Sequence, residues 1–217
     1  MKKQNKKIKE PRKEILKISQ QLFNTKGFEQ TSINEIMRNV GMAKGGFYYY
    51  FESKDEILDE LVNRYIDSKI SKVQSIIEDN NHNALVKLKL MFIAEFEHDI
   101  QYNQPDNHLH DIKNVDMHQR ILVKMVKKYA PVINQVVLQG IEESIFKVEY
   151  PLEASEFLVA GFHFLCDLGI FSWNKDEYTR KVKATEEIIE KTLGIEKGSM
   201  AFLSSMLTKK ELKKEVF

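Results

Sequence analysis

Helix-breaking residues are scarce in this chain, and their scarcity limits the folds that it can adopt. The 217 residues include only 9 glycines and 4 prolines, and few segments show the alternation of β-branched and polar residues that is typical of strands. Apolar residues recur instead at three- and four-residue intervals, which is the spacing of one face of an α-helix. The sequence therefore predicts an all-α fold of about nine helices.

A cluster of short helices is predicted near the N-terminus. Ser32 and Glu35 have the spacing of a capping box, which begins a short helix that Gly41 should end. A second short helix follows, and another capping box at residues 53–56 opens a long helix. Two short helices joined by a glycine-containing turn are typical of a helix-turn-helix, which we place at about residues 32–51.

Positive charge is concentrated in the same part of the chain. Residues 1–54 hold 12 lysines and arginines against 5 aspartates and glutamates, although the net charge of the whole chain is only +1. A basic segment is typical of a protein that binds an anionic partner. A solvated basic tail would give the same count, so charge alone favours neither interpretation.

The segment GMAKGGFYYYF, residues 41–51, combines glycine, lysine and aromatic side chains at the expected second helix. Gly45 would let the backbone approach a phosphate or a base edge closely, as would the glycine after it, and Lys44 supplies positive charge. Phe47 is expected to face inward, whereas Tyr48 and Tyr49 can donate a phenolic O–H to phosphate and place ring surface against a sugar or a thymine methyl group. This division of aromatic side chains between a small core and an outer face favours a DNA-reading helix.

Residues from about 9 to 69 resemble the DNA-binding domain of the TetR family of tetracycline-repressor-like regulators. The first helix ends in a Gly-Phe pair, a Thr-Ser-hydrophobic element follows, and a Gly-hydrophobic turn leads into the aromatic recognition helix and the start of the fourth helix. The motifs that match are Gly27-Phe28, Thr31-Ser32-Ile33, Gly41-Met42, Gly45 to Phe51 and Lys54 to Leu58. Tyr50 departs from the pattern, because His is common at that position, and this leaves the expected contacts of that residue open.

The resemblance implies a set of DNA contacts and a division into two domains. Residues 9–69 would bind DNA, and residues 70–217 would form a helical domain that binds a small molecule and dimerises. The implied contacts to phosphates and bases come from Thr31, Ser32, Ala43, Lys44, Gly45, Tyr48, Tyr49 and Lys54. Thr31 and Ser32 could equally serve as helix caps, and Lys54 could be a solvated helix start. The lysine-rich arm before residue 10 is expected to be disordered without DNA.

A ligand pocket and a dimer interface are both expected in the second domain. Large apolar side chains suit an irregular pocket, although any of them can instead be ordinary core; the candidates are Met91, Phe92, Phe96, Met117, Ile121, Met125 and Ile141. Two long helices, over about 151–172 and 176–193, should form a four-helix bundle with a second subunit. The interface candidates are Phe157, Gly161, Phe164, Leu168 and Ile188. The alternative is a monomer whose central helix is simply well buried.

Histidines and carboxylates gather between residues 98 and 118, but their spacing matches no strong metal motif. We expect a polar loop there, with no metal and no cofactor; ligand contacts by these residues remain an alternative, and the role of the region from His98 to His118 is left open. The single cysteine, Cys166, rules out an internal disulfide, and its apolar surroundings favour a structural thiol over a redox sensor.

The sequence thus favours a homodimeric, cytoplasmic transcriptional repressor that binds a palindromic operator in double-stranded DNA. An unknown small-molecule effector would modulate that binding, and no membrane contact is expected. A non-enzymatic role is predicted, because no triad order, Glu-x-x-His pair or phosphate-binding glycine loop is evident. A helical adaptor that docks a protein on the aromatic segment is the alternative from another class. The operator, the effector, the direction of its effect and the regulated genes are not given by the sequence.

Overall fold

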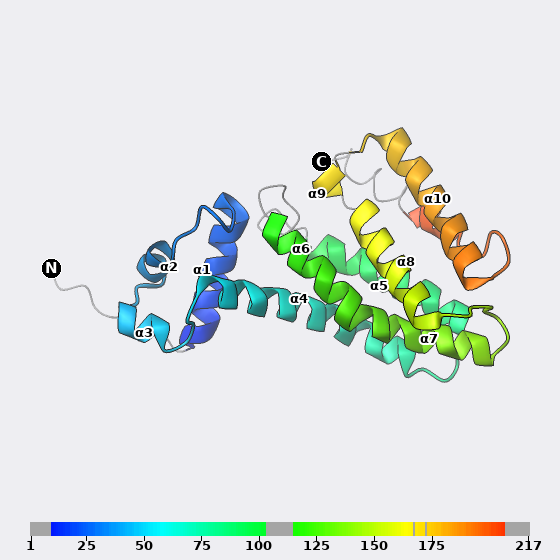
Figure 1. Cartoon of the computed structure of the whole chain (residues 1–217), viewed down its shortest axis with the longest axis horizontal. Helices are drawn as coiled ribbons and strands as arrows, with labels where there is room; N and C mark the ends of the chain where they lie inside the picture. Colours follow the sequence, from blue (N-terminus) through cyan, green and yellow to red (C-terminus); the bar gives the residue numbers. More distant parts are fainter. Residues whose placement is uncertain (1–9, 103–114, 167, 172, 207–217) are drawn as a thin grey trace. The chain divides into compact units, whose positions relative to one another are not determined.

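The computed structural model describes residues 10–102, 115–166, 168–171 and 173–206, with side chains at 10–95, 117–166, 170–171 and 173–206. Helices alone make up the regular structure of these residues, as the sequence predicts. They are α1 (Pro11–Lys26), α2 (Ile33–Val40), α3 (Lys44–Tyr48), α4 (Lys54–Ile77), α5 (Ala84–Tyr102), α6 (Val115–Lys124), the π-helical turn η2 (Met125–Tyr129), α7 (Ala130–Glu142), α8 (Pro151–Leu165), α9 (Leu168–Phe171) and α10 (Lys175–Leu193). Figure 1 shows their order along the chain.

The chain forms two compact units, and α4 belongs to both of them. The first unit contains the described residues up to Tyr65 together with residues 115–120, and the second contains the remainder. The predicted division after residue 69 stays a prediction, because α4 runs without interruption from Lys54 to Ile77.

In the first unit, α1, α2 and α3 surround a small core of large side chains. Phe23, Ile36, Phe47 and Phe51 are almost completely buried there, together with Ile57 from α4. Aromatic side chains bury the most area per residue, so a few of them can hold a unit of this size together.

In the second unit, α7 packs against α5 and α8, and α10 packs against α8 (Figure 1). Between α6 and α7 the chain changes its helical hydrogen bonding. The segment η2 is π-helical from Met125 to Tyr129. Pro131 follows closely and has no N–H to donate to the preceding turn, which accounts for the change of hydrogen bonding there.

The helix expected over residues 151–172 is also interrupted. α8 ends at Leu165, and the short α9 begins at Leu168. α10 begins as the sequence predicts, because Asn174 and Glu177 form a complete capping box at its start. The C-cap of α10, Gly194, has a positive φ of 62°, a conformation that glycine adopts readily.

Candidate nucleic-acid interface and ligand cavity

The helix-turn-helix is set by α2, a tight turn and α3. Ser32 caps α2 by accepting a hydrogen bond from the backbone N–H of Glu35 at 3.2 Å. Gly41 ends the helix with a φ of 75°, and its N–H donates to the carbonyl of Met37. A side chain would be strained in this left-handed conformation, so the glycine fixes where the chain turns toward α3.

Phe47 anchors α3, because its ring is fully buried in the core of the first unit. Around this anchor, Ala43, Lys44, Gly45, Tyr48 and Tyr49 are all exposed; we call these five residues the α3 edge. Tyr49 is 81% exposed and Tyr48 41%, so both rings are open to a partner. The α3 edge therefore offers one positive charge, two phenolic hydroxyls and an uncovered stretch of backbone to a partner.

Three other predicted contact residues have roles within the protein. The Thr31 side chain is buried and donates to the carbonyl of Gly27 at 2.8 Å. Lys54 Nζ donates to the carbonyl of Phe28 at 2.7 Å and lies 4.2 Å from the centre of the Phe28 ring. Ser32 caps α2, as its alternative states, whereas Thr31 bonds the residue that ends α1 and Lys54 packs on Phe28 rather than forming a solvated helix start. The DNA contacts of these three residues stay predictions.

Arg12 in α1 supports the helix-turn-helix in a way that the sequence analysis missed. Its guanidinium donates to the backbone carbonyl of Tyr50 at 3.0 Å, lies 4.5 Å from the ring centre of Phe51 and forms an ion pair with Glu60. Burial on its own would raise the pKa of Glu60. The hydrogen bonds and charges of Arg12 and Arg64 outweigh burial and hold that pKa below its usual value.

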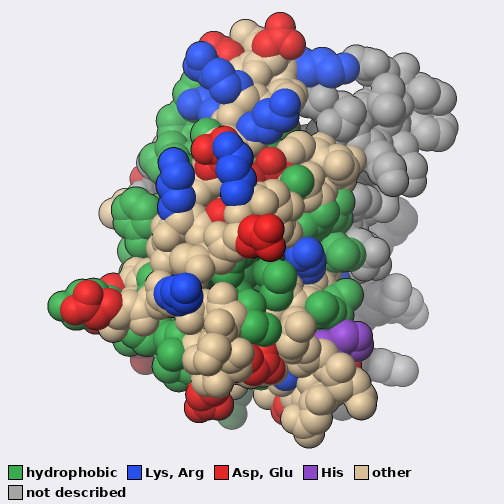
Figure 2. Space-filling view, turned by 90° about the vertical axis from the view of Figure 1, so that its right-hand side faces the viewer, with side chains coloured by type: hydrophobic (Ala, Val, Ile, Leu, Met, Phe, Trp, Pro, Cys, Tyr) green, Lys and Arg blue, Asp and Glu red, His purple; other side chains and the backbone are tan. Residues whose placement is uncertain are grey.

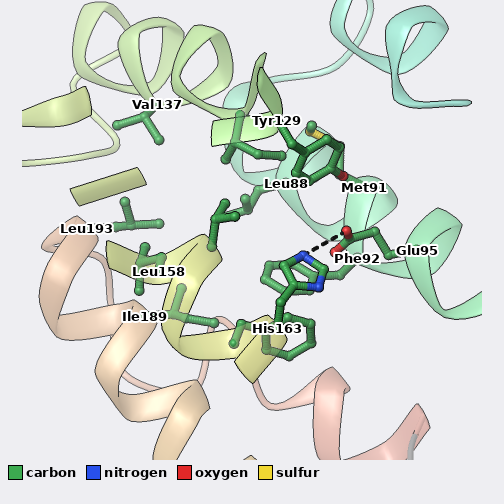
Figure 3. A pocket seen from close by; sticks show the side chains of 13 residues that line it. Leu88, Met91, Phe92, Glu95, Tyr129, Val137, Leu158, His163, Ile189 and Leu193 are labelled. Atoms are coloured by element: carbon green, nitrogen blue, oxygen red, sulfur yellow. Dashed lines mark ion pairs between the residues drawn. The ribbon is translucent and has the colours of Figure 1, made fainter. Parts of the chain in front are cut away.

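The second unit contains a partly open cavity lined by four helices and η2. Its lining is apolar except at one end, where Glu95, Tyr129 and His163 meet (Figure 3). About 40 Å³ of it is open to the centres of water molecules. The lining residues are Leu88, Met91, Phe92 and Glu95 from α5, Tyr129 from η2, Ile133 and Val137 from α7, Leu158, Val159, Phe162 and His163 from α8, and Ile189 and Leu193 from α10.

Two of the predicted pocket residues, Met91 and Phe92, line this cavity, whereas Met117, Ile121, Met125 and Ile141 are not among its lining residues. The side chain of Phe96 lies outside the described residues. The residues of α8 and α10 that line the cavity were not predicted from the sequence. Single polar residues on apolar helices, such as His163 on α8, were the signal that could have pointed to them.

The dimer candidates form an exposed apolar strip on α8. Phe157 is 67% exposed and Phe164 42%, and together with Gly161 they have the spacing of one helix face. A Cβ atom added at Gly161 would meet no atom within 4 Å. Ile188 on α10 is also exposed, and the side chain of Leu168 lies outside the described residues.

The residues from 98 to 118 are described only in part. His98, His108 and His110 lie outside the described side chains. Among the side chains that are described, no three His, Cys, Asp or Glu residues gather as metal ligands would. Burial raises the pKa of the Cys166 thiol, which lowers its thiolate fraction and agrees with the interpretation as a structural thiol.

Comparison with known proteins identifies both parts of the chain. Residues 15–61 match the model of bacterial regulatory proteins of the tetR family, and residues 99–188 match the tetracyclin repressor-like C-terminal domain. The chain belongs to the TetR family. Members of this family are DNA-binding transcriptional regulators, and ligand-modulated DNA binding is typical of them; this protein is a transcriptional regulator of the family.

Relatives of the TetR-family chain include the transcriptional repressor KstR2 of Mycobacterium tuberculosis, which is 27% identical over 150 residues, 65% of this chain and 72% of the relative. Among solved structures, FadR of Bacillus subtilis in complex with stearoyl-CoA has a TM-score of 0.61 and 18% identity, over 83% of this chain and 97% of that one. SmeT, the repressor of a Stenotrophomonas maltophilia multidrug efflux pump, has a TM-score of 0.63 and 15% identity, over 88% and 93%. At these identities the two structures show the shared fold.

Within the described residues, every helix is too short or too polar to cross a bilayer.

Proposed function

We propose that the protein is a homodimeric repressor that places the α3 edges of its two subunits in successive major grooves of a palindromic operator. The observation that carries this proposal is the α3 edge, whose exposed residues 43–45 and 48–49 lie on either side of the buried anchor Phe47 in the sequence. Lys44 would neutralise a phosphate, the two tyrosines would donate to phosphates or base edges, and Gly45 would allow close backbone approach.

The exposed strip on α8 supports the dimer. Two large rings and Ile188 of α10 lie uncovered in the described chain, and burying such side chains against a second copy would be favourable by roughly 1.5–3 kcal/mol for each fully buried side chain.

Figure 2 shows lysine and arginine interspersed with aspartate and glutamate on a face of the molecule. Such a mixture is typical of a solvated surface rather than of a DNA-binding one.

The cavity in the second unit is the proposed effector site. FadR was solved with stearoyl-CoA and a further neighbour of the same fold, RolR, with resorcinol, which supports a small-molecule ligand for this chain as well. Tyr129, in η2, lines the cavity, and η2 is continuous with α6. Arg120 of α6 forms ion pairs with Asp55 and Asp59 at the start of α4, the second at 2.9 Å. We propose that a ligand against Tyr129 acts through α6 and α4 on the spacing of the two α3 helices.

A DNA-binding experiment tests the proposal. Fluorescence anisotropy would be measured with the DNA that flanks the gene of this protein, in the presence of excess non-specific competitor. The double variant Lys44→Ala/Tyr48→Ala should lose operator binding while its thermal melting and its dimer mass stay unchanged. The matched variant Lys197→Ala/Tyr150→Ala removes one exposed lysine and one exposed tyrosine from the second unit, and it should bind as the wild type does. Unchanged affinity of the first variant would refute the assignment of the α3 edge.

A further inference from the structure

The polar end of the cavity has a composition that selects among ligands. Glu95 and His163 point toward each other across the cavity wall, and Tyr129 lies close by (Figure 3). The Nε2 atom of His163 is 3.2 Å from Oε1 of Glu95, and it is buried without a hydrogen bond of good geometry. The rest of the lining is apolar, so a ligand would have one place at which to pair a polar group.

The electrostatics of this end favour an uncharged polar group. Lys69 Nζ donates to the same Glu95 oxygen at 3.4 Å, and Lys69 is 2% exposed and Glu95 8%. The buried pair is therefore neutral as a whole. A carboxylate or an ammonium group brought into contact with it would add an uncompensated charge to a site whose lining is otherwise apolar, which costs several kcal/mol. A hydroxyl group adds no charge and can both donate and accept.

Aromatic rings surround the polar end and favour a ligand that itself contains a ring. The rings of Phe92 and Phe162 meet edge to face with centres 5.2 Å apart, and the rings of Tyr129 and His163 do so at 6.2 Å. Such edges and faces attract a further ring in an offset or T-shaped arrangement. The limited free volume, about 40 Å³ open to water centres, favours a compact ligand over a long chain.

We propose that the effector is an uncharged ring compound with a hydroxyl group, a phenol or a cyclic alcohol, whose hydroxyl pairs with His163 and Glu95. This inference rests on the proposed function, because it gives the ligand class for the same cavity. A ligand that carries a carboxylate or an ammonium group is the alternative, and it would bring an unpaired charge to the buried pair.

Three probes of one shape separate these possibilities: 2-naphthol, 2-naphthoate and 2-naphthylmethylammonium. Their affinities for the full-length protein would be measured by isothermal titration calorimetry at pH 7.5. We expect 2-naphthol to bind at least about tenfold more tightly than either charged probe. Tighter binding of either charged probe, or binding of none of the three, would overturn the inference.

Two variants localise the hydroxyl. His163→Phe keeps a ring on α8 but removes the polar atoms, and it should weaken 2-naphthol about tenfold while leaving naphthalene almost unchanged. Leu158→Met, also in the lining, conserves volume and should affect both compounds alike. Equal losses of both compounds in His163→Phe would refute the contact. Because binding is measured without DNA, 2-naphthol that binds tightly but leaves operator affinity unchanged would support the ligand class and refute the effector role of the cavity.

Discussion

Replacing Gly45 with alanine should raise the stability of the protein and lower its affinity for DNA. A Cβ atom at this position would meet no atom within 4 Å, and the φ angle of Gly45 lies outside the left-handed range. The fold therefore accommodates alanine without strain. Alanine is favoured over glycine within a helix by about 0.5–1 kcal/mol, and because α3 has only five residues we expect the lower end of that range. The melting temperature should stay constant or rise slightly.

The expected loss of DNA affinity is larger than the gain in stability. The added methyl group would stand on the α3 edge, where the backbone is proposed to approach the DNA. If it separates the surfaces enough to break one charge-assisted contact in each half-site, the cost is about 1.5 kcal/mol per subunit and 3 kcal/mol per dimer, or roughly a hundredfold in Kd.

Anisotropy titrations at a fixed salt concentration would measure the DNA affinity, and thermal melting of the same samples would measure stability. Gly46→Ala is the comparison: Gly46 is exposed as well, but a Cβ atom there would lie 3.3 Å from Cγ of Met42, so this variant should change the melting temperature too and shows the effect of altered packing. The reasoning is refuted if Gly45→Ala binds the operator as tightly as the wild type does.

Three further changes test the supports of the fold and the dimer. Arg12→Ala should lower the free energy of unfolding by about 1–2 kcal/mol, since the lost charge-assisted hydrogen bonds are partly exposed to solvent. The ion pair lowers the pKa of Glu60 and so stabilises the folded state at pH values above the unfolded-state pKa. The difference in unfolding free energy between wild type and Arg12→Ala, measured by urea denaturation, should therefore shrink as the pH falls below about 4. A difference that grew would contradict the ion pair. Phe157→Asp should convert the dimer to a monomer in light scattering with the helical circular dichroism unchanged; a persistent dimer would exclude the α8 strip. Gly140→Ala should destabilise by about 1–3 kcal/mol in thermal melting, because the new methyl group would overlap the buried ring of Phe146, and an unchanged melting temperature would contradict that packing.

The all-α fold and the helix-turn-helix could be predicted because their determinants are local. The cap at Ser32 and the stop at Gly41 are encoded within ten residues of sequence, and both are present in the structure. The inward position of Phe47 follows from helical spacing relative to its neighbours. Side-chain direction at element ends was harder to predict. The partners of Thr31 and Lys54 within the protein are backbone carbonyls that only the folded chain brings near, and the DNA contacts expected of both residues stay predictions.

The cavity could not be located from the sequence, because it depends on which helices converge. Met91 lines it, whereas Met117 and Met125 do not, although all three are buried. The same composition and periodicity describe a core methionine and a cavity methionine. The contributions of α8 and α10 come from residues far along the chain from α5, and a single sequence does not specify that packing.

The central claim is that the α3 edge touches the operator, and photocrosslinking tests it most directly. Tyr49, which is 81% exposed, would be replaced by p-benzoylphenylalanine, as would Tyr150, which is 64% exposed in the second unit. After irradiation with labelled operator DNA, the protein substituted at position 49 should form a covalent adduct within the half-site, and the protein substituted at position 150 should form none. An adduct from position 150 together with none from position 49, in a protein that still binds the DNA, would contradict the account.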